Sequence, residues 1–285
     1  MMTRTVFLNG NFVAEQDAKV SIFDRGFLMS DAAYEVTGVI NGKMVEFDQH
    51  IGRLQRTLEE LSIRNPLSQK EWKDIHVKLL EANNIKFGTI YIQVTRGNPG
   101  DRDFEYPSAE LPPTVIAFTQ SRVDPLSTQQ FKNGCRVITL PDLRWCRRDL
   151  KTTQLLYASM AKMAAKRVGA DDAWLIEDGF ITEGSSSNVF MIANGVLKTR
   201  PANNEILHGI CRVTVLELAE ALNLSVKIEA FTAEEAKLAD EVFFTSSFSY
   251  VVPVVSIDGV EIGTGKPGRI TKRLRELYLE RRLAS

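Results

Sequence analysis

The chain has few of the residues that build metal sites and disulfide frameworks. Its 285 residues include only three cysteines, Cys135, Cys146 and Cys211, which are odd in number and show no C-x-x-C spacing. Such cysteines fit reduced thiols in a cytoplasm better than a set of disulfides. The three histidines are scattered, with no spacing typical of metal ligands. The sequence therefore predicts a cytoplasmic protein without a metal site.

Long apolar segments and a net charge are absent as well. The longest apolar run, near Tyr250–Val255, is broken by Pro253 and is far shorter than the roughly 20 residues of a membrane-spanning helix. The first ten residues, MMTRTVFLNG, contain no apolar stretch of the kind found in signal peptides. A formal net charge of −1 gives no reason to expect nucleic acid or a membrane surface as a partner.

Three common catalytic signatures are also missing. The chain has no G-x-G-x-x-G, no P-loop and no G-x-S-x-G. The segment GTGKPG at 263–268 lacks the spacing and the Lys-Ser/Thr ending of a P-loop, so we interpret it as a turn before the last helix.

What the chain does have is a mixture of hairpins and helices. The pairs Asn9-Gly10, Asn41-Gly42, Asp178-Gly179 and Asn194-Gly195 predict hairpin turns between strand-like segments. Helical spacing of apolar residues follows in several segments, the first with Asp48 as its expected N-cap. Because βαβ alternation is absent, these patterns favour an α+β fold.

The distribution of polar residues predicts two domains. Segment 119–130, TQSRVDPLSTQQ, is polar, contains a proline and is typical of a linker. We therefore expect an N-terminal α+β domain over 1–118 and a C-terminal domain over 131–285.

Chemistry is suggested by several segments that are ordinary one by one. Lys151, in DLKTTQLL, stands just before a helix in a partly apolar setting, where a lysine can form a Schiff base. Glu183 precedes a glycine and three serines in TEGSSSN. LHGICR at a helix start and FTSSFS at a strand end suit a phosphate group. Taken one at a time, these features are better explained as a solvated lysine, an acid at a strand end and surface serines. Together, a Schiff-base lysine, a carboxylate and a phosphate cradle are what a pyridoxal phosphate site requires.

The sequence resembles the fold type IV pyridoxal-phosphate enzymes, and among them the D-amino-acid (D-alanine) aminotransferases. The segments that carry the resemblance occur in the family's order over nearly the whole chain: DRGF, YEV, HIGRL, IYIQVTRG, RW, DLKTTQLL, TEGSSSNVF, PANNEILHGICR and FTSSFS. This resemblance implies a two-domain fold with an N-terminal α/β sandwich and a C-terminal β-barrel-like domain that binds pyridoxal 5′-phosphate.

The resemblance also implies roles for individual residues. Lys151 would be the catalytic lysine that holds the cofactor and moves the proton between Cα and C4′, and Glu183 would hold the pyridine N–H. The small residues after Glu183 would let the chain pass close to the cofactor. The other implied cofactor-binding residues are Arg53, Leu207, Ile210, Cys211, Ser246 and Ser247. Without the resemblance, Arg53 is equally a surface arginine, and Leu207 and Ile210 are equally core residues.

The residues implied for substrate binding are Tyr34 and Arg102, which match the trap for the substrate α-carboxylate. In the family the arginine loop comes from the other subunit, so the resemblance implies a homodimer. Phe104 stands where the best-known members have a histidine, and the loop has one extra residue before Arg102. We expect these differences to affect substrate specificity.

Three further departures from the family pattern lie outside the substrate loop. Cys211 replaces a threonine of the phosphate cradle, where its backbone N–H can still serve. Ser30 and Ala32 replace glycines that usually follow DRGF.

The predicted function is transfer of an amino group from D-alanine to 2-oxoglutarate, giving pyruvate and D-glutamate by ping-pong kinetics. A branched-chain L-amino-acid aminotransferase, an (R)-amine transaminase and an aminodeoxychorismate lyase are alternatives on the same fold. The branched-chain enzymes carry a tyrosine where Leu156 stands, and the lyases carry KHLN where this chain has KTTQ. A non-catalytic binding module is the remaining hypothesis, and the presence of Lys151, Glu183 and Arg53 argues against it.

Overall fold

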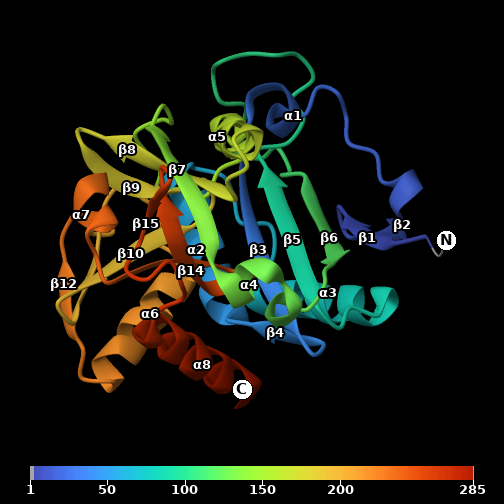
Figure 1. The fold of residues 1–285 in the computed structure, drawn as a ribbon. Helices are drawn as coiled ribbons and strands as arrows, with labels where there is room; N and C mark the ends of the chain where they lie inside the picture. Colours follow the sequence, from blue (N-terminus) through green and yellow to red (C-terminus); the bar gives the residue numbers. More distant parts are fainter. Residues whose placement is uncertain (1–2, 285) are drawn as a thin grey trace. The chain divides into compact units, whose positions relative to one another are not determined.

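The structure, a computed structural model, describes residues 3–284 and divides into two compact units (Figure 1). Unit 1 comprises the chain up to Asp124 together with Leu150–Gln154. Unit 2 comprises Pro125–Asp149 and the chain from Leu155 onward.

The chain enters unit 2 inside the segment predicted as a linker, 119–130. The start of that segment completes strand β6 (Val115–Ser121), and a 3₁₀ helix, η2 (Pro125–Ser127), follows. Leu150–Gln154, which contains Lys151, packs with unit 1, although its sequence lies within the predicted second domain. Nothing in the composition of Leu150–Gln154 indicates that this segment packs with unit 1. The predicted domain boundaries stay a prediction.

The described part of unit 1 is a six-stranded antiparallel sheet in the order β2-β1-β6-β5-β3-β4. Its other strands are β1 (Thr5–Leu8), β2 (Asn11–Ala14), β3 (Ala32–Ile40), β4 (Lys43–Val45) and β5 (Gly88–Thr95). Its helices are η1 (Glu15–Asp17), α1 (Arg25–Met29), α2 (Phe47–Glu60) and α3 (Gln69–Asn83). Apolar residues of α2 and α3, such as Leu54 and Trp72, pack with Ile90 and Ile92 of β5 to form the core.

Local sequence signals explain most of these boundaries. At the β1–β2 turn, Asn9 and Gly10 adopt positive φ values of 45° and 91°, as a tight hairpin turn requires. The prediction that Asp48 caps α2 is wrong. The helix begins at Phe47, after Glu46 in a left-handed conformation, and it has no side-chain cap.

Unit 2 contains a nine-stranded mixed sheet in its described part, with β12-β11-β10-β13-β14-β7-β8-β9 in order and β15 paired with β14. The strands are β7 (Cys135–Pro141), β8 (Asp172–Glu177), β9 (Phe180–Gly184), β10 (Asn188–Ala193), β11 (Val196–Thr199), β12 (Ser225–Ile228), β13 (Glu241–Ser246), β14 (Tyr250–Ile257) and β15 (Val260–Glu261). The sheet curls into a half-barrel around a core that includes Trp174, Phe231 and Val254 (Figure 1).

Helices pack against several of these strands. In addition to η2, the described part of unit 2 has the helices α4 (Gln129–Asn133), α5 (Leu156–Arg167), α6 (Ile210–Ala221), α7 (Ala233–Lys237) and α8 (Arg269–Ala284). Helices α6 and α8 contact β13, and α5 contacts β8. The predicted α+β fold, with a barrel-like sheet in its second half, is confirmed.

Across residues 3–284, no helix combines the length and the apolar character needed to cross a membrane. The same residues contain no group of three or more His, Cys, Asp or Glu side chains placed to hold a metal ion.

Candidate active site

Backbone pairing in unit 1 brings the predicted catalytic lysine to the predicted substrate tyrosine. An isolated bridge between Ala33 and Thr152 aligns the Lys151 segment with β3, and Tyr34 N donates to Lys151 O over 3.0 Å. The Lys151 ammonium donates to the Tyr34 hydroxyl over 3.2 Å and lies 4.3 Å from the centroid of the Tyr34 ring. Two residues that are 117 positions apart in the sequence thus form one polar contact.

The Tyr34 ring stacks against other aromatic rings on the same face of the sheet. It stacks on Tyr91 with a centroid distance of 5.4 Å, and Tyr91 stacks on Phe118 at 4.9 Å. The Tyr91 hydroxyl donates to Gln93 Oε1 over 2.7 Å. Offset ring stacks of this kind restrict side-chain motion, so the Tyr34 hydroxyl has a defined position.

Arg53 faces the other side of β3, where it binds a buried carboxylate. Arg53 Nε donates to Glu35 Oε1 over 2.7 Å, and Arg53 Nη2 donates to Glu35 Oε2 over 2.9 Å. His50 Nδ1 lies 2.8 Å from Glu35 Oε2. Burial by itself would raise the pKa of Glu35, but the charge and hydrogen bonds of Arg53, helped by His50, hold that pKa far below its ordinary value.

A buried threonine connects Arg53 to the lysine segment. The Thr57 hydroxyl donates to Arg53 O over 3.0 Å, and Lys151 N donates to that hydroxyl over 3.5 Å. Unit 1 therefore brings together three of the predicted residues, Lys151, Tyr34 and Arg53.

The predicted carboxylate arginine, Arg102, lies in the exposed loop that follows β5. Its guanidinium carbon is 4.8 Å from the centroid of the exposed Phe104 ring, a cation–π contact. The phenylalanine that replaces the expected histidine therefore contacts the arginine directly. Within the described residues of unit 1, no contact joins Arg102 to Lys151 or Tyr34.

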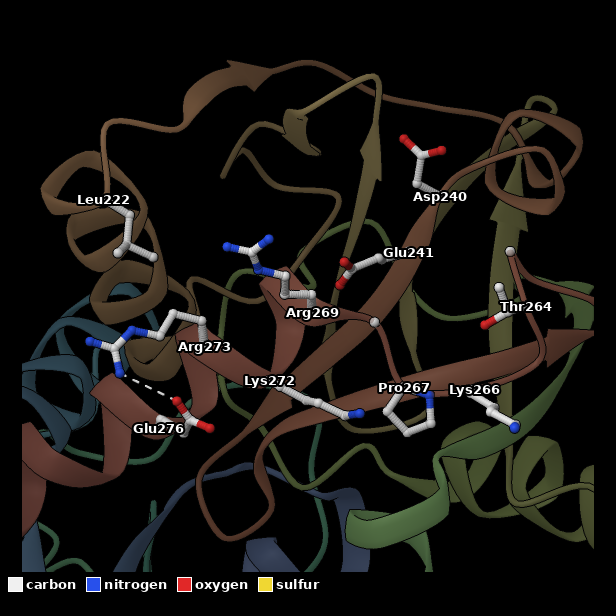
Figure 2. A pocket seen from close by; sticks show the side chains of 12 residues that line it. Leu222, Asp240, Glu241, Thr264, Lys266, Pro267, Arg269, Lys272, Arg273 and Glu276 are labelled. Atoms are coloured by element: carbon white, nitrogen blue, oxygen red, sulfur yellow. Dashed lines mark hydrogen bonds and ion pairs between the residues drawn. The ribbon is translucent and has the colours of Figure 1, made fainter.

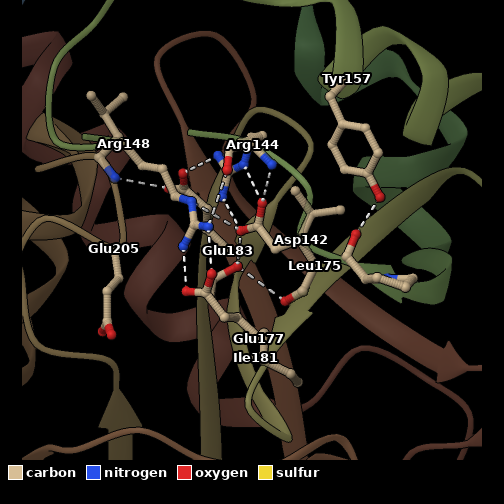
Figure 3. Close-up of polar contacts among 12 residues, drawn as sticks. Asp142, Arg144, Arg148, Tyr157, Leu175, Glu177, Ile181, Glu183 and Glu205 are labelled. Carbon is tan, nitrogen blue, oxygen red and sulfur yellow. Dashed lines mark hydrogen bonds and ion pairs between the residues drawn. The ribbon is translucent and has the colours of Figure 1, made fainter. Parts of the chain in front are cut away.

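In unit 2, Glu183 lies at the end of β9 and is 4% exposed. Its Oε1 accepts from Arg144 Nη1 over 2.5 Å (Figure 3). Its Oε2 accepts from Asn188 Nδ2 and from Leu207 N, each over 3.1 Å. Burial raises the pKa of Glu183, and the charge and hydrogen bond of Arg144 offset only part of that effect.

Arg144 is itself fixed by a second carboxylate, as Figure 3 shows. Arg144 Nε donates to Asp142 Oδ1 over 2.9 Å, and Arg144 Nη2 donates to Asp142 Oδ2 over 2.6 Å. The Thr182 hydroxyl donates to Asp142 Oδ2 over 2.7 Å. A planar guanidinium with donors on both edges suits this bridge between two acids.

The hydrogen bonds of Glu183 leave capacity for one more donor. An ionised carboxylate has about four acceptor positions. Among the described residues Glu183 accepts three bonds, one at Oε1 and two at Oε2. A single further N–H group is what a protonated pyridine nitrogen would offer.

The small residues after Glu183 form a turn that folds back on itself. Gly184 N donates to Ser187 O over 2.7 Å, and a Cβ on Gly184 would lie only 2.2 Å from Ser187 Oγ. Gly209 meets the same limit, since a Cβ there would lie 1.8 Å from Asn188 Oδ1. The side chains of Ser187 and Asn188 therefore leave no room for a larger residue at these two positions unless they move.

The predicted phosphate cradle is partly assembled in unit 2. Helix α6 begins after Gly209 without a side-chain cap, so the N-terminal turn of Ile210 and Cys211 has no side-chain acceptor there. Cys211 Sγ lies 3.3 Å from Ser246 O, which places Ser246 beside the helix start. Ser247 lies in the turn that follows β13.

Sequence reasoning missed several residues of these groups. Arg144 lies in the quoted RW motif, and its cluster of arginines beside Asp142 was a usable signal. Glu35 shares one face of β3 with Ala33 and Thr37, and all three are fully buried, so the strand period of two would have marked Glu35 as a buried acid. Thr245, next to Ser246, buries a hydroxyl with no partner in the described residues.

A cavity of about 1000 Å³ in unit 2 contains none of the predicted site residues (Figure 2). It lies beside the start of α8 and includes the segment 263–268. Glu241 accepts from Ile270 N over 2.9 Å and from Thr271 N over 2.8 Å, so the protein's own carboxylate caps this helix. The segment forms turns, as its sequence indicated.

Comparison with known proteins assigns a family. The model of the amino-transferase class IV family matches residues 32–257. A D-alanine aminotransferase of Staphylococcus aureus (strain N315) is 40% identical over 271 residues, which are 95% of this chain and 95% of that protein.

Solved structures share the fold. A branched-chain amino acid aminotransferase of Escherichia coli superposes with a TM-score of 0.89 at 23% identity, covering 98% of this chain and 94% of that one. A second branched-chain amino acid aminotransferase, from T.th. and complexed with N-(5′-phosphopyridoxyl)-L-glutamate, gives a TM-score of 0.87 at 25% identity, with the same coverage.

Proposed function

Because this chain belongs to the class IV aminotransferases, we propose that it transfers the amino group of D-alanine to 2-oxoglutarate, giving pyruvate and D-glutamate. The family supports the reaction class. The choice of a D-amino acid is supported by 40% identity to a D-alanine aminotransferase over almost the whole chain, against 23% to 25% for the branched-chain enzymes.

The observation that carries this proposal is the contact between Lys151 and Tyr34. An amine that must remove a proton from the substrate Cα has to be fixed near the group that binds the substrate carboxylate. The 3.2 Å contact between Lys151 Nζ and the Tyr34 hydroxyl meets that requirement, although the two residues lie 117 positions apart in the sequence.

The residues present fit pyridoxal 5′-phosphate as the cofactor. Glu183 keeps one acceptor position open for an N–H group, and the Thr245 hydroxyl beside Ser246 has no partner in the described residues. Lys151 would hold the cofactor, and Glu183 would accept from its pyridine nitrogen. The phosphate would be held by Arg53, Ile210, Cys211, Ser246 and Ser247, with Leu207 against the ring.

When bound, this cofactor supplies a carbonyl group that condenses with amines and a ring that accepts the electrons left when Cα loses its proton. Lys151 would be the base that removes the Cα proton and delivers it to C4′. Glu183, held by Arg144, would maintain the charge on the pyridine nitrogen. Since donor and acceptor use the same groups in turn, we expect ping-pong kinetics.

The substrate carboxylate would be bound by Tyr34 together with Arg102 of a second subunit. Two features support a homodimer. The Arg102 loop is exposed, and five exposed large apolar side chains lie close together in one short segment: Val20, Ile22, Phe23, Phe27 and Leu28. Light scattering after gel filtration should give twice the 32.0 kDa chain mass, and Phe27→Glu should shift it toward the monomer.

The cellular location that we propose is the cytoplasm. All three cysteines are free thiols, which a reducing compartment maintains.

The experiment that tests the function is the visible spectrum of the purified protein before and after D-alanine, with L-leucine as a parallel control. We expect D-alanine alone to remove the band of the bound cofactor. If only L-leucine removes it, the protein is a branched-chain enzyme and the role of Arg102 is wrong. A band that neither amino acid changes would point to an amine transaminase or a lyase.

A further inference from the structure

The DRGF stretch, which the candidate site does not use, anchors the start of α1 to the end of β5. The Asp24 carboxylate accepts from Gly26 N over 2.8 Å and from the Thr95 hydroxyl over 3.0 Å. A Cβ on Gly26 would lie 2.4 Å from Thr95 Cγ2, so only glycine allows this approach. The backbone that carries Arg25 is therefore fixed on both sides.

Arg25 holds the loop that contains Arg102 at its start and again just after Arg102. Arg25 N donates to Gly97 O over 3.0 Å, where the loop begins. Arg25 is 3% exposed, and its Nη1 donates to Asp103 O over 2.5 Å and to Glu105 O over 3.2 Å. Its Nε donates to the Asp31 carboxylate over 2.7 Å, which holds the guanidinium in this orientation.

A second arginine completes this group. Arg96 binds Asp31 through Nε and Nη2 over 2.7 and 3.1 Å, and it donates to the carbonyl oxygens of residues 61–62, directly after α2. The Tyr106 ring lies 3.7 Å from the Arg96 guanidinium carbon and 5.9 Å from that of Arg25. We call Arg25, Asp31 and Arg96 the loop clamp. Figure 1 shows the loop after β5 passing beside α1.

We infer that Arg25 is a positioning residue that holds the backbone around Arg102 in place, so that the Arg102 guanidinium is already oriented for a substrate carboxylate. This inference rests on the proposed role of Arg102. A loop of this length without a clamp would have to be ordered by the substrate itself, which lowers affinity.

Only arginine can make this set of contacts. Its fork binds one carboxylate and two carbonyl oxygens at the same time, whereas a lysine ammonium on a flexible stem is a point charge. Arg25→Lys should therefore keep the charge and lose the geometry.

The test compares Arg25→Lys with a matched control, Arg275→Lys, in the cofactor-loaded protein. Arg275 also donates to a backbone carbonyl, Phe131 O, over 2.5 Å, and its guanidinium carbon lies 3.9 Å from the centroid of the Phe131 ring. Both residues belong to unit 2, whereas the loop belongs to unit 1. Two readouts are needed. The first is the concentration of D-alanine, and of D-alaninamide with its uncharged amide, that removes half of the cofactor band. The second is hydrogen–deuterium exchange of the peptide 98–110.

We expect Arg25→Lys to raise the half-effective D-alanine concentration about tenfold, because a displacement of about 1 Å can cost that much or more. The D-alaninamide value should change less than about twofold, and loop exchange should become several-fold faster. Arg275→Lys should change neither readout. Equal losses for both amines, or unchanged loop exchange, would overturn the inference.

A milder variant keeps the test decisive if Arg25→Lys does not fold. Tyr106 is 62% exposed, so Tyr106→Leu removes the ring beside the two arginines without opening the core. It should give a smaller effect in the same direction, and unchanged D-alanine response and loop exchange would again overturn the inference. If the wild-type protein does not react with D-alanine at all, the proposed function fails, whereas loop exchange still decides whether Arg25 holds the loop.

Discussion

Two buried glutamates, Glu35 in unit 1 and Glu183 in unit 2, each bind an arginine, yet their pKa values move in opposite directions. Arg53 binds both oxygens of Glu35 and His50 adds a further contact, so the pKa of Glu35 is lowered despite complete burial. Arg144 binds one oxygen of Glu183 and shares its charge with Asp142, so burial prevails and the pKa of Glu183 is raised.

The difference separates a carboxylate that holds the protein together from one that can serve a ligand. Glu35 uses its carboxylate oxygens to hold Arg53 and His50. Glu183 retains an acceptor position for a ligand. Its partner Arg144 is held by two hydrogen bonds to Asp142, which do not involve Glu183.

The largest expected effect comes from removing Lys151, the proposed base. Lys151→Ala removes the proposed base and should lower turnover of D-alanine by at least ~10³-fold. The free energy of unfolding of the cofactor-free protein should change little, because Lys151 is half-buried and its backbone contacts remain. Normal activity in this variant would sink the assignment.

A pair of isosteric substitutions tests the comparison directly. Glu183→Gln should lower turnover about 100-fold, because a neutral amide cannot maintain charge on the pyridine nitrogen, with a small loss of stability. Glu35→Gln should instead lower the free energy of unfolding by about 3 kcal/mol, since the buried Arg53 loses a carboxylate partner. Urea titration and turnover of both variants supply the measurements, and the reverse pattern would contradict the distinction.

Arg102→Ala should raise the KM for D-alanine at least about tenfold, the value of a hydrogen bond to a charged group. The KM for D-alaninamide should remain within about twofold, since it has no carboxylate. Steady-state kinetics of both substrates decide this, and equal changes would remove Arg102 from the carboxylate trap.

The pH dependence of stability should show the two glutamates with opposite signs. The folded pKa of Glu35 lies below its ordinary value of 4.5, so its stabilisation is present above that pH and is lost as the pH falls. Between about pH 6 and pH 4 the wild type should lose about 1 kcal/mol more than Glu35→Gln.

Glu183, whose folded pKa is raised above 4.5, should behave in the opposite way. Its contribution is greatest below its ordinary pKa and is lost as the pH rises toward the folded value. Glu183→Gln should therefore gain stability relative to the wild type as the pH rises above about 4.5. Identical slopes for the two variants in urea titrations would remove the distinction.

The smallest effect concerns the turn that leads into β3, the strand of Glu35. Ser30, at a position where the family usually has glycine, adopts a left-handed φ of 55°. Ser30→Gly should raise the free energy of unfolding by about 0.5 kcal/mol, because a left-handed side-chain residue costs about 1 kcal/mol and glycine regains only part of that in chain entropy. Thermal unfolding measures this, and a lower Tm would show that Ser30 is not strained.

Local features of this molecule were predictable because they depend on neighbouring residues. Asn9-Gly10 forms its hairpin because the turn needs positive φ, and Thr232 with Glu235 forms a capping box because both lie within one helical turn. The start of α2 was missed because Glu46 adopts a left-handed conformation that its side chain does not favour.

The candidate site was predictable only through its short motifs. Lys151 and Glu183 lie in segments distinctive enough to show the family, which the comparisons confirm. Their partners were not predictable in the same way. Arg144 and Leu207 reach Glu183 from segments 39 and 24 residues away, and sequence spacing carries no sign of such contacts.

By itself, then, the sequence determined the hairpin turns, the α+β class and the residues able to do amino-transfer chemistry, since each depends on residue type and short spacing. Only the tertiary structure decided which arginine serves which acid. It placed Lys151 in unit 1 beside Tyr34, and it set the pKa of Glu35 and that of Glu183 on opposite sides of the ordinary value. Burial and distance decide those outcomes, and both depend on segments that meet only after the chain has folded.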